Sequence, residues 1–493
     1  MELMDISINI NDYYLDYFEK LAFLRNPERC SQLWEHWNLH LDISYSCKSN
    51  ADLFSLVKSI SNIYTLTCLK LEIYVYDTEF TEKNLNVELF PFVKLSNLAD
   101  FTLLFDVRDL PINLTSLARL HNLTSLKIHG IYYRYVSLID ITPLAGLTQL
   151  KHLDLQYHNM KDITPLAKLT ELETLYIQRC SISDITPLAG LSNLKILNIG
   201  VNRITNISPL ARLTKLEILD MTDNRNITDI TPLAGLTKLT KLYLPFMKNP
   251  DITVLANLIK LKTLKIYSSE IADIAPLESL TELKKLFFSH NKISNVAPLA
   301  GLVKLEKLKL YGNKIANIAP LANLVNLTEL DLGYNKIADI KPLASLANLT
   351  KLDLSGNKIA DIKPLANLAN LTTLNLSYNK IANIKPISSL NNLENLLLHY
   401  NKISDITPLA GLVKLHWLSL NNNKIIDIIS LKKLLKLKVL WLDNNQIKSI
   451  KVLKNFKELS ILDLENNKIT DFAPLDKLIY NYGIEEVYYD EPE

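Results

Sequence analysis

The chain repeats itself with a period of 22 residues, and this restricts its fold more than any other feature. Leucines open successive units from Leu150 to Leu216 and from Leu239 to Leu459 at that interval. The unit that starts at Leu216 carries one extra residue, and a longer unit that starts at Leu123 precedes the regular ones. Because one short unit cannot bury its apolar face alone, such units stack on one another into a solenoid.

The unit from Leu349 to Leu368 shows what each position contributes. Its first leucines, Leu349, Leu352 and Leu354, follow the pattern L-x-x-L-x-L. This alternation is typical of a short strand whose every second side chain points inward. Neighbouring units then place their strands about 4.8 Å apart in a parallel sheet. Pro364 lacks an N–H group and suits the start of a short helical or 3₁₀ turn on the convex side.

An asparagine follows each strand at the point where the chain turns. Its amide can donate to and accept from backbone groups of adjacent turns, which would otherwise be buried without partners. Other residues, Cys180 and His158 among them, occupy this place in earlier units, as do Met247 and Ser269. Cys180 is therefore interpreted as a ladder substitute and not as a nucleophile. The predicted ladder consists of Asn291, Asn313, Asn335, Asn357, Asn379, Asn401, Asn423, Asn445 and Asn467.

The pattern L-x-x-L-x-L-x-x-N-x-I-x-D-I-x-P-L-A-x-L resembles the leucine-rich-repeat family, specifically its 22-residue class. That class includes the bacterial internalins and the SDS22-type phosphatase regulators. The resemblance covers roughly Leu98 to Leu478. It implies an α/β fold, a leucine-rich-repeat solenoid. In this fold a curved right-handed superhelix carries a parallel β-sheet on its concave face and short 3₁₀ or helical turns on its convex face. It also implies protein binding, although the same frame serves many partners.

The ends of a solenoid must cover its first and last coils. Residues 1–65 are predicted to be an N-terminal cap region with a helix near 11–25, and a separate docking module is the other interpretation. Residues 66–122 are interpreted as degenerate repeats, and residues 123–480 as about sixteen 22-residue repeats. Residues 481–493 are predicted to form a C-terminal cap and acidic tail. We expect Tyr480, Ile484 and Val487 to cover the last coil.

Composition argues against several classes of partner. Lys and Arg total 54 against 52 for Asp and Glu, so nothing favours nucleic acid or an anionic membrane. No secretory signal or transmembrane segment is recognisable, and the four cysteines form no paired framework. Cytoplasmic localisation is therefore the expectation, with export by an unrecognised route left open. Recurrent N-x-S/T sequons, such as Asn326 to Thr328, fall at one place in the repeat, so register explains them better than glycosylation.

The sequence gives no support for catalysis. It contains no phosphate-binding loop, no H-E-x-x-H and no G-x-S-x-G. The nine histidines are scattered, and none stands at metal-ligand spacing with the cysteines. The chain is therefore predicted not to be an enzyme, with no catalytic residues, no metal and no cofactor.

Outward-facing aromatic and basic residues near the middle of the repeats are the candidate binding site. Exposed aromatic clusters are frequent in binding surfaces, and the fold does not need them. The other interpretation is that these side chains only stabilise their cross-strand neighbours. The predicted partner is another protein, with an acidic or phosphorylated segment as its expected form. The candidate residues are Tyr243, Phe246, Lys265, Tyr267, Phe287, His290, Lys309, Tyr311 and Tyr334.

One lysine per unit also follows the ladder asparagine, from Lys292 to Lys424. It is interpreted as a solvated edge, because Asp or Asn stands three residues later in each unit, and an anion-binding rim is the other interpretation. The predicted function is a non-catalytic protein-binding scaffold that uses the concave face, with a regulatory subunit as one form. The alternative is an exported internalin-type adhesin or effector that binds a host protein. The sequence does not specify an oligomeric state.

Overall fold

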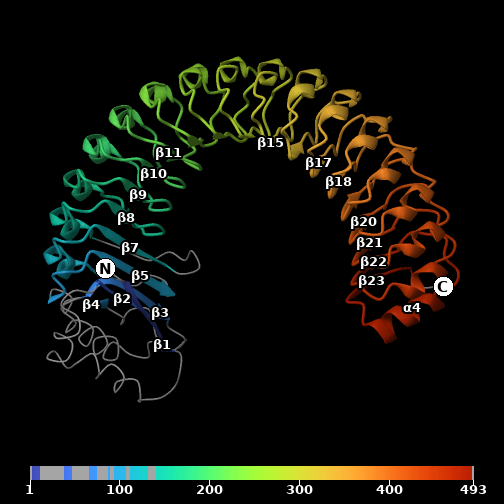
Figure 1. Ribbon diagram of the computed structural model, residues 1–493, viewed down its shortest axis with the longest axis horizontal. Helices are drawn as coiled ribbons and strands as arrows, with labels where there is room; N and C mark the ends of the chain where they lie inside the picture. Colours follow the sequence, from blue (N-terminus) through green and yellow to red (C-terminus); the bar gives the residue numbers. More distant parts are fainter. Residues whose placement is uncertain are drawn as a thin grey trace. The chain divides into compact units, whose positions relative to one another are not determined.

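The computed structural model describes residues 3–10, 38–46, 66–74, 87–88, 94–106, 112–130 and 140–490. The chain divides into two compact units, Met1–Met247 and Lys248–Glu493. Within each unit, the strands lie on the concave side of the coils and the 3₁₀ turns lie on the opposite, convex side (Figure 1). This is the leucine-rich-repeat solenoid that the repeat pattern predicts.

The first unit is a parallel sheet whose strands pair in chain order. Its early strands have six to nine residues, whereas those from β8 onward have three. A separate two-residue pair joins β4 (Val87–Glu88) to β6 (Ile112–Asn113). The strands of the main sheet are β1 (Leu3–Ile10), β2 (Asn38–Ser46), β3 (Leu66–Tyr74), β5 (Asp100–Asp106), β7 (Ser125–Gly130), β8 (His152–Asp154), β9 (Thr174–Tyr176), β10 (Ile196–Asn198), β11 (Ile218–Asp220) and β12 (Lys241–Tyr243).

Two of these strands, β1 and β2, lie within the region assigned to the N-terminal cap. They pair in parallel with each other, and β2 pairs with β3, so the sheet extends further toward the N-terminus than the repeat pattern indicates. The helix predicted near 11–25 lies outside the described residues. The limits of the cap region therefore stay a prediction.

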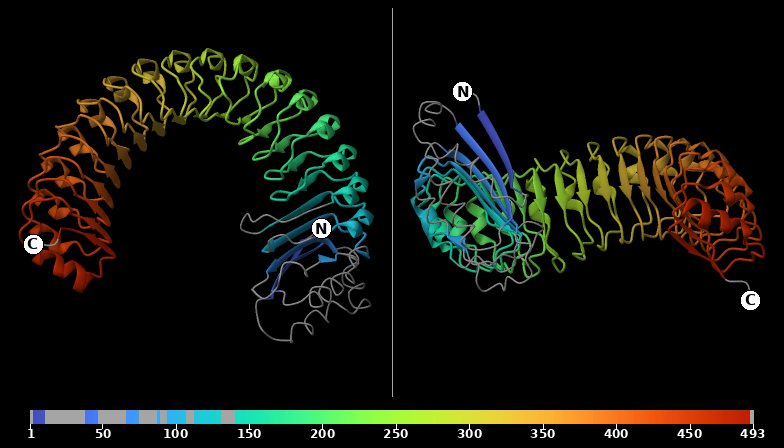
Figure 2. Two further views of the ribbon diagram at one scale, coloured as in Figure 1. Left: turned by 180° about the vertical axis from the view of Figure 1, so that it is seen from behind. Right: turned by 90° about the horizontal axis from the view of Figure 1, so that it is seen from below.

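The second unit repeats the same geometry more regularly. Its strands form a row of parallel arrows in Figure 2. They are β13 (Thr263–Lys265), β14 (Lys285–Phe287), β15 (Lys307–Lys309), β16 (Glu329–Asp331), β17 (Lys351–Asp353), β18 (Thr373–Asn375), β19 (Asn395–Leu397), β20 (Trp417–Ser419), β21 (Val439–Trp441), β22 (Ile461–Asp463) and β23 (Glu486–Tyr488).

A 3₁₀ turn connects successive strands, with the repeat proline near its start in most units, as expected. An aspartate or asparagine two residues before the turn accepts a hydrogen bond from its first N–H group, as Asp361 does from Lys363 at 3.0 Å. The turns are η2 (Thr115–Arg119), η4 (Thr142–Gly146), η5 (Thr164–Lys168), η6 (Thr186–Gly190), η7 (Ser208–Arg212), η8 (Thr231–Gly235), η9 (Thr253–Asn257), η10 (Ala275–Leu277), η11 (Ala297–Leu299), η12 (Ala319–Asn323), η13 (Lys341–Ser345), η14 (Lys363–Asn367), η15 (Lys385–Ser389), η16 (Thr407–Gly411), η17 (Ile429–Lys433) and η18 (Lys451–Asn455).

Leucines fill the space between the strands and the turns. In the second unit Leu286, Leu308 and Leu330 are direct register partners on adjacent strands, and all three are buried. Each coil therefore buries its leucines against those of its neighbours, which supplies the apolar driving force that a single coil lacks.

The asparagine ladder is present and makes the predicted contacts. Asn335 Oδ1 accepts from the Ile315 N–H group at 2.9 Å, and its Nδ2 donates to the carbonyls of Leu310 and Leu332 at 3.0 Å. In the first unit Cys180 is buried at a ladder position, and its Sγ donates to the Leu155 carbonyl at 3.1 Å. Burial raises the pKa of the Cys180 thiol to about 12, so it is held as a neutral thiol and is no nucleophile.

The sequons are explained by register. The Nδ2 of Asn326 donates to the Val303 carbonyl at 2.9 Å, and Thr328 Oγ1 donates to the Glu306 carbonyl at 3.1 Å. Asn348 and Thr350 make the same two bonds one coil later. Both side chains of the sequon therefore join neighbouring coils.

The C-terminal end combines α4 (Ala473–Lys477), the π-helical turn η19 (Leu478–Tyr482) and β23, which pairs with β22. The expectation that Tyr480 covers the last coil is wrong, because its side chain is 81% exposed. Ile484 and Val487 are half-buried, and Val487 is the register partner of Leu462 on β22. Leu475 and Leu478 are fully buried there. No helix in the described part of the chain is long and apolar enough to cross a membrane.

Candidate functional site

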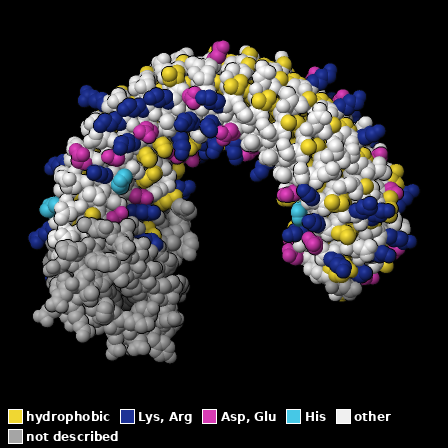
Figure 3. Space-filling view, in the orientation of Figure 1, with side chains coloured by type: hydrophobic (Ala, Val, Ile, Leu, Met, Phe, Trp, Pro, Cys, Tyr) yellow, Lys and Arg dark blue, Asp and Glu magenta, His cyan; other side chains and the backbone are white. Residues whose placement is uncertain are grey.

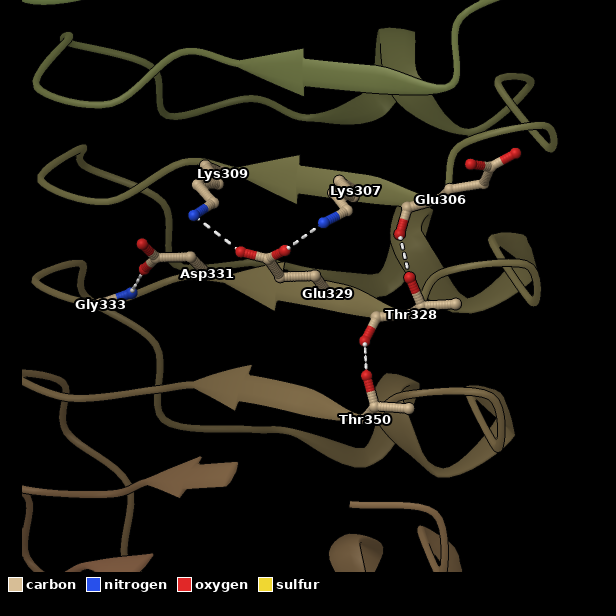
Figure 4. A network of polar contacts seen from close by, with 8 residues as sticks. All are labelled: Glu306, Lys307, Lys309, Thr328, Glu329, Asp331, Gly333 and Thr350. Carbon is tan, nitrogen blue, oxygen red and sulfur yellow. Dashed lines mark hydrogen bonds and ion pairs between the residues drawn. The ribbon is translucent and has the colours of Figure 1, made fainter. Parts of the chain in front are cut away.

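The strand face of the second unit carries an ion-pair network in which the basic side chains lie on β15 and the acidic ones on β16. The Glu329 carboxylate on β16 lies 2.9 Å from Lys307 Nζ and 2.7 Å from Lys309 Nζ, both on β15 (Figure 4). Asp331 and Asp353 follow as register partners on β16 and β17. Basic and acidic side chains therefore stand on neighbouring strands, and Lys309 is already paired.

The Asp331 carboxyl is one of the strongly perturbed acids of this face. Burial first, and then the neighbouring Asp353, raise its pKa to about 6, although Asp331 Oδ1 accepts from the Gly333 N–H group at 3.0 Å. Since the ordinary value is 3.8, the folded chain binds this proton more tightly than the unfolded chain does. Ionised Asp331 therefore opposes folding, and this effect grows as the pH rises from 3.8 toward 6.

We expect the substitution Asp331→Asn to stabilise the chain at about pH 7, because asparagine keeps the acceptor for Gly333 and carries no charge. The advantage over the wild type should shrink as the pH falls through 6 and should be mostly lost at about pH 4. Chemical denaturation of both proteins across this pH range measures the difference. A stability difference that does not change with pH would show that Asp331 keeps an ordinary pKa in the folded chain.

A continuous row of rings lies beside this network, where the strands end. Ring centroids are 5.0 Å apart for His290 and Tyr311, 5.1 Å for Tyr311 and Tyr334, and 6.4 Å for Tyr334 and Tyr378. Tyr378 stacks on Tyr400 at 4.4 Å and meets His399 edge-on. The side chains of Tyr334, Tyr378 and Tyr400 are exposed by 43–48%. We name the aromatic ridge as His290, Tyr311, Tyr334, Tyr378, His399 and Tyr400.

Glycines of the following coils make room for these rings. A Cβ atom at Gly312 would lie 2.8 Å from His290 Nδ1, and one at Gly356 would lie 2.9 Å from Tyr334 Cγ. Tyr334 itself has a φ of +50°, and Tyr378 and Tyr400 have a φ of +54°. A left-handed conformation is uncommon for a bulky residue and costs of order 1 kcal/mol. The same left-handed conformation occurs before the ladder position in coils that carry Val201, Asn422 or Asn444 there, so it belongs to the repeat turn, and the rings project from that turn.

A row of exposed lysines follows the ladder asparagines along the same edge. Its members are Lys292, Lys314, Lys336, Lys358, Lys380, Lys402 and Lys424, which we call the lysine row. Within the described residues, Lys292 is the only member in an ion pair, with Glu270 at 2.8 Å. The aspartates expected to compensate the row, such as Asp339 and Asp405, instead accept hydrogen bonds from the backbone N–H groups of the 3₁₀ turns.

The predicted site residues fall into three groups. Tyr243 and Phe246 belong to the first unit, with Tyr243 opposite Asp220 in the register of β11 and β12. Phe287 lies between Lys265 and Lys309 in the strand register of the second unit, and the ammonium group of Lys265 lies 4.8 Å from the Tyr267 ring centroid. His290, Tyr311 and Tyr334 form the N-terminal half of the aromatic ridge.

The other half of the ridge, with Tyr378, His399 and Tyr400, was not included in the predicted site. The signal for this half in the sequence is the tyrosine directly before the ladder asparagine, at Tyr378 and Tyr400. The glycines Gly312, Gly333 and Gly356 accompany the half that was predicted. A Cβ atom at Gly333 would lie 2.8 Å from Tyr311 Cδ2. Glycine in one coil next to an aromatic residue in the preceding coil thus indicates an outward ring.

The side chains gathered here can stack, donate hydrogen bonds and attract anions. The described residues contain no group of three or more His, Cys, Asp or Glu side chains that could hold a metal ion. On the face seen in Figure 3, basic and acidic side chains are interspersed among hydrophobic ones. This chemistry suits the recognition of another macromolecule.

A family profile described as "Leucine Rich repeats (2 copies)" matches the chain at residues 148–190, 170–212, 192–235, 281–323, 325–367, 369–412, 413–455 and 435–477. These ranges together cover more than half of the chain. The chain belongs to the leucine-rich-repeat family. Among curated proteins, none matches this chain.

Solved structures agree with this assignment. An internalin from Listeria monocytogenes, inlF, is 38% identical over 58% of this chain and 86% of its own, with a TM-score of 0.56. The repeats of this leucine-rich-repeat protein are therefore internalin-like. The ectodomain of the receptor kinase GASSHO1/SCHENGEN3 from Arabidopsis thaliana, in complex with CASPARIAN STRIP INTEGRITY FACTOR 2, is 18% identical. It covers 92% of this chain and 56% of its own with a TM-score of 0.70, a similarity of fold alone.

A plant peptide hormone receptor, RGFR1 in complex with RGF2, shares the fold in the same way. It is 19% identical over 92% of this chain and 82% of its own, with a TM-score of 0.66. The family and fold are typical of non-enzymatic scaffolds for protein interaction.

Proposed function

We propose that the chain is a non-catalytic scaffold whose second unit binds a segment of another protein along the aromatic ridge. The observation that carries the proposal is the ridge itself, in which exposed or half-buried rings from coils one or two units apart lie 4.4 to 6.4 Å from each other. Exposed and pre-ordered tyrosines lose little side-chain entropy on binding and are frequent among hot spots. Structural neighbours crystallised with peptide or protein ligands support this kind of partner.

The site differs from the one that the sequence predicts. The strand residues Lys265, Phe287 and Lys309 stay part of the proposed surface as its border, since Lys309 is paired with Glu329. Tyr243 and Phe246 remain candidates on the first unit. The ridge is the centre because its rings are contiguous and outward.

A substitution test addresses the ridge directly. We expect the triple variant Tyr334→Ala, Tyr378→Ala and Tyr400→Ala to weaken binding of a selected peptide by at least about tenfold, since truncating a hot-spot ring costs more than about 1 kcal/mol. Peptides would be selected from an array of random sequences with the full-length chain. The dissociation constants for the wild type and the variant would then be measured by fluorescence anisotropy.

A matched control uses Val303→Ala, Val325→Ala and Val413→Ala. These three valines belong to the same unit, are 46–47% exposed and lie just after the 3₁₀ turns, away from the ridge. The control should bind like the wild type. Equal binding by the ridge variant would exclude the ridge as the site. An array in which no peptide is selected would reject peptide binding by this scaffold.

The place of action is a second question, for which two proposals compete. The sequence favours a cytoplasmic scaffold, with an SDS22-type regulatory subunit as one form. The 38% identity with an internalin favours an exported adhesin or effector. Fractionation of the source cells separates the two, because recovery at the surface or in the medium supports export, whereas recovery in the cytoplasm alone supports the regulatory role.

A further inference from the structure

We infer that the segment bound along the aromatic ridge is an acidic, extended stretch of protein, and that the lysine row supplies the complementary charge. This inference rests on the proposed function and names the chemistry of its partner. The inference adds the lysine row to the proposed site, and none of these lysines belongs to the aromatic ridge or to the strand face.

The rings and the lysines run side by side because of the turn that holds them. In the coil with Tyr334 and Lys336, the two residues flank the buried ladder residue Asn335. Their Cα atoms are therefore at most about 7 Å apart, since consecutive Cα atoms are separated by about 3.8 Å. The same order recurs with Tyr378, Asn379 and Lys380. Because coils repeat about every 4.8 Å, one ammonium group follows another beside the rings.

Few direct ion pairs neutralise the lysine row. Beyond Lys292, no member of the lysine row forms an ion pair among the described residues. Three other exposed lysines, Lys341, Lys363 and Lys385, begin η13, η14 and η15 on the convex side and are not members of the row. The aspartates of these turns use an oxygen to hold the turn N–H groups. A partner that brings carboxylates to this edge therefore meets cations without carboxylate partners.

The strand face is a poorer place for such a partner. Glu329 already binds Lys307 and Lys309, and Asp331 lies on the same strand (Figure 4). Asp353 is the register partner of Asp331 on the next strand. A carboxylate arriving there would have to displace Glu329 and would meet two further acids. Charge complementarity thus places the acidic segment at the edge of the coils, beside the ridge.

The ring geometry favours a peptide over a single-stranded nucleic acid. Bases bind such proteins by stacking on open aromatic faces. Tyr378 and Tyr400 instead stack on each other at 4.4 Å with their planes 11° apart, which leaves no room for a base between them. Their exposed edges can still contact an extended backbone. The formal net charge of the whole chain, +2, is also small for a nucleic-acid binder.

The test uses a fluorescein-labelled peptide of Glu-Tyr-Glu-Gly repeats and the same peptide with Gln in place of Glu. We expect the full-length chain to bind the acidic peptide more tightly than the neutral one, with an affinity that falls as salt increases. The triple variant Lys336→Gln, Lys358→Gln and Lys380→Gln should weaken binding of the acidic peptide roughly tenfold, since three exposed ion pairs with the partner are lost together. The neutral peptide should be unaffected.

The control variant, Lys341→Gln, Lys363→Gln and Lys385→Gln, changes the same charge in the same three coils, five residues along the chain. This control variant should lose less than half as much affinity for the acidic peptide as the variant of the lysine row does. Equal losses in both variants, or none in either, would overturn the inference. So would a single-stranded oligonucleotide or an anionic lipid vesicle that binds through the lysine row more tightly than the acidic peptide. If neutral peptides bind through the ridge and the lysines have no effect, the proposed function stands and this inference fails.

Discussion

The substitution Asn335→Ala should destabilise the chain by about 2–4 kcal/mol, since a buried polar group left without its partner costs about 1–3 kcal/mol. Asn335 is 9% exposed, and one side chain serves two coils. Alanine would leave the Ile315 N–H group without its acceptor at 2.9 Å and the Leu310 carbonyl without its donor at 3.0 Å. The loss should appear as a lower midpoint in chemical denaturation, at an unchanged backbone fold.

Asn348→Ala is the matched control. Asn348 also joins two coils, through Nδ2 and the Val325 carbonyl at 2.9 Å, but it is exposed. Water can replace that contact, so the expected loss is below about 1 kcal/mol. If both alanine variants lose the same free energy of unfolding, burial does not explain the contribution of the ladder asparagines to stability.

The substitution Phe288→Ala should cost about 3–5 kcal/mol, as truncation of a buried phenyl group usually does. Phe288 is fully buried and lies next to Phe287 at the end of β14. The following coils carry Leu310 and Leu332 at the same place. Truncation therefore removes apolar contacts and leaves a cavity between stacked coils. Chemical denaturation measures the loss.

Phe288→Leu provides the comparison, because leucine is the residue that the neighbouring coils use. Its cost should stay below about 1.5 kcal/mol, since a similar hydrophobic side chain can repack the space. If Phe288→Leu loses as much stability as Phe288→Ala, the space in this coil fits only the phenyl ring. That result would contradict the expectation that this coil packs like its neighbours. The backbone of His290 and the ridge beyond it should be unaffected by the leucine variant.

The aromatic ridge shows how a repeat separates stability from recognition. Leu332 and Asn335 of one coil are buried, whereas Tyr334 between them is 48% exposed. The buried positions must recur in every coil, because each coil is packed against the next. The exposed position before the asparagine is free to change, and it holds glycine at Gly312 and Gly356 but tyrosine at Tyr334 and Tyr378.

Much of the fold follows from the sequence by local rules. The 22-residue period predicts stacked coils, and the alternation Leu349, Leu352 and Leu354 predicts an inward-facing strand. The role of Cys180 is also readable, because its register position matches that of the ladder asparagines and its thiol does contact a buried carbonyl. Each of these features recurs at the same position in every unit, so the repeating pattern alone is enough to predict it.

Other features depend on contacts between the side chains of different coils, which the 22-residue period does not specify. Tyr334 and Tyr378 are 44 positions apart yet have ring centroids separated by 6.4 Å. Pairing of Glu329 with Lys309 depends on which strand faces which, and on rotamers that no pattern specifies. The repeat pattern does not predict strands β1 and β2, because the sequence around them lacks the regular spacing of leucines.

The sequence by itself thus determined the coil, its buried leucines, its asparagine ladder and its membership in the leucine-rich-repeat family. Each of these is demanded by the burial of apolar and polar groups in every unit. Only the tertiary structure decided which exposed side chains meet, namely that the rings from His290 to Tyr400 form one ridge and that Lys309 is paired while Lys336 and Lys358 are not. The physical reason is that exposed residues are free of the packing constraint that makes buried ones periodic, so their neighbours are set by the stacking of coils in space.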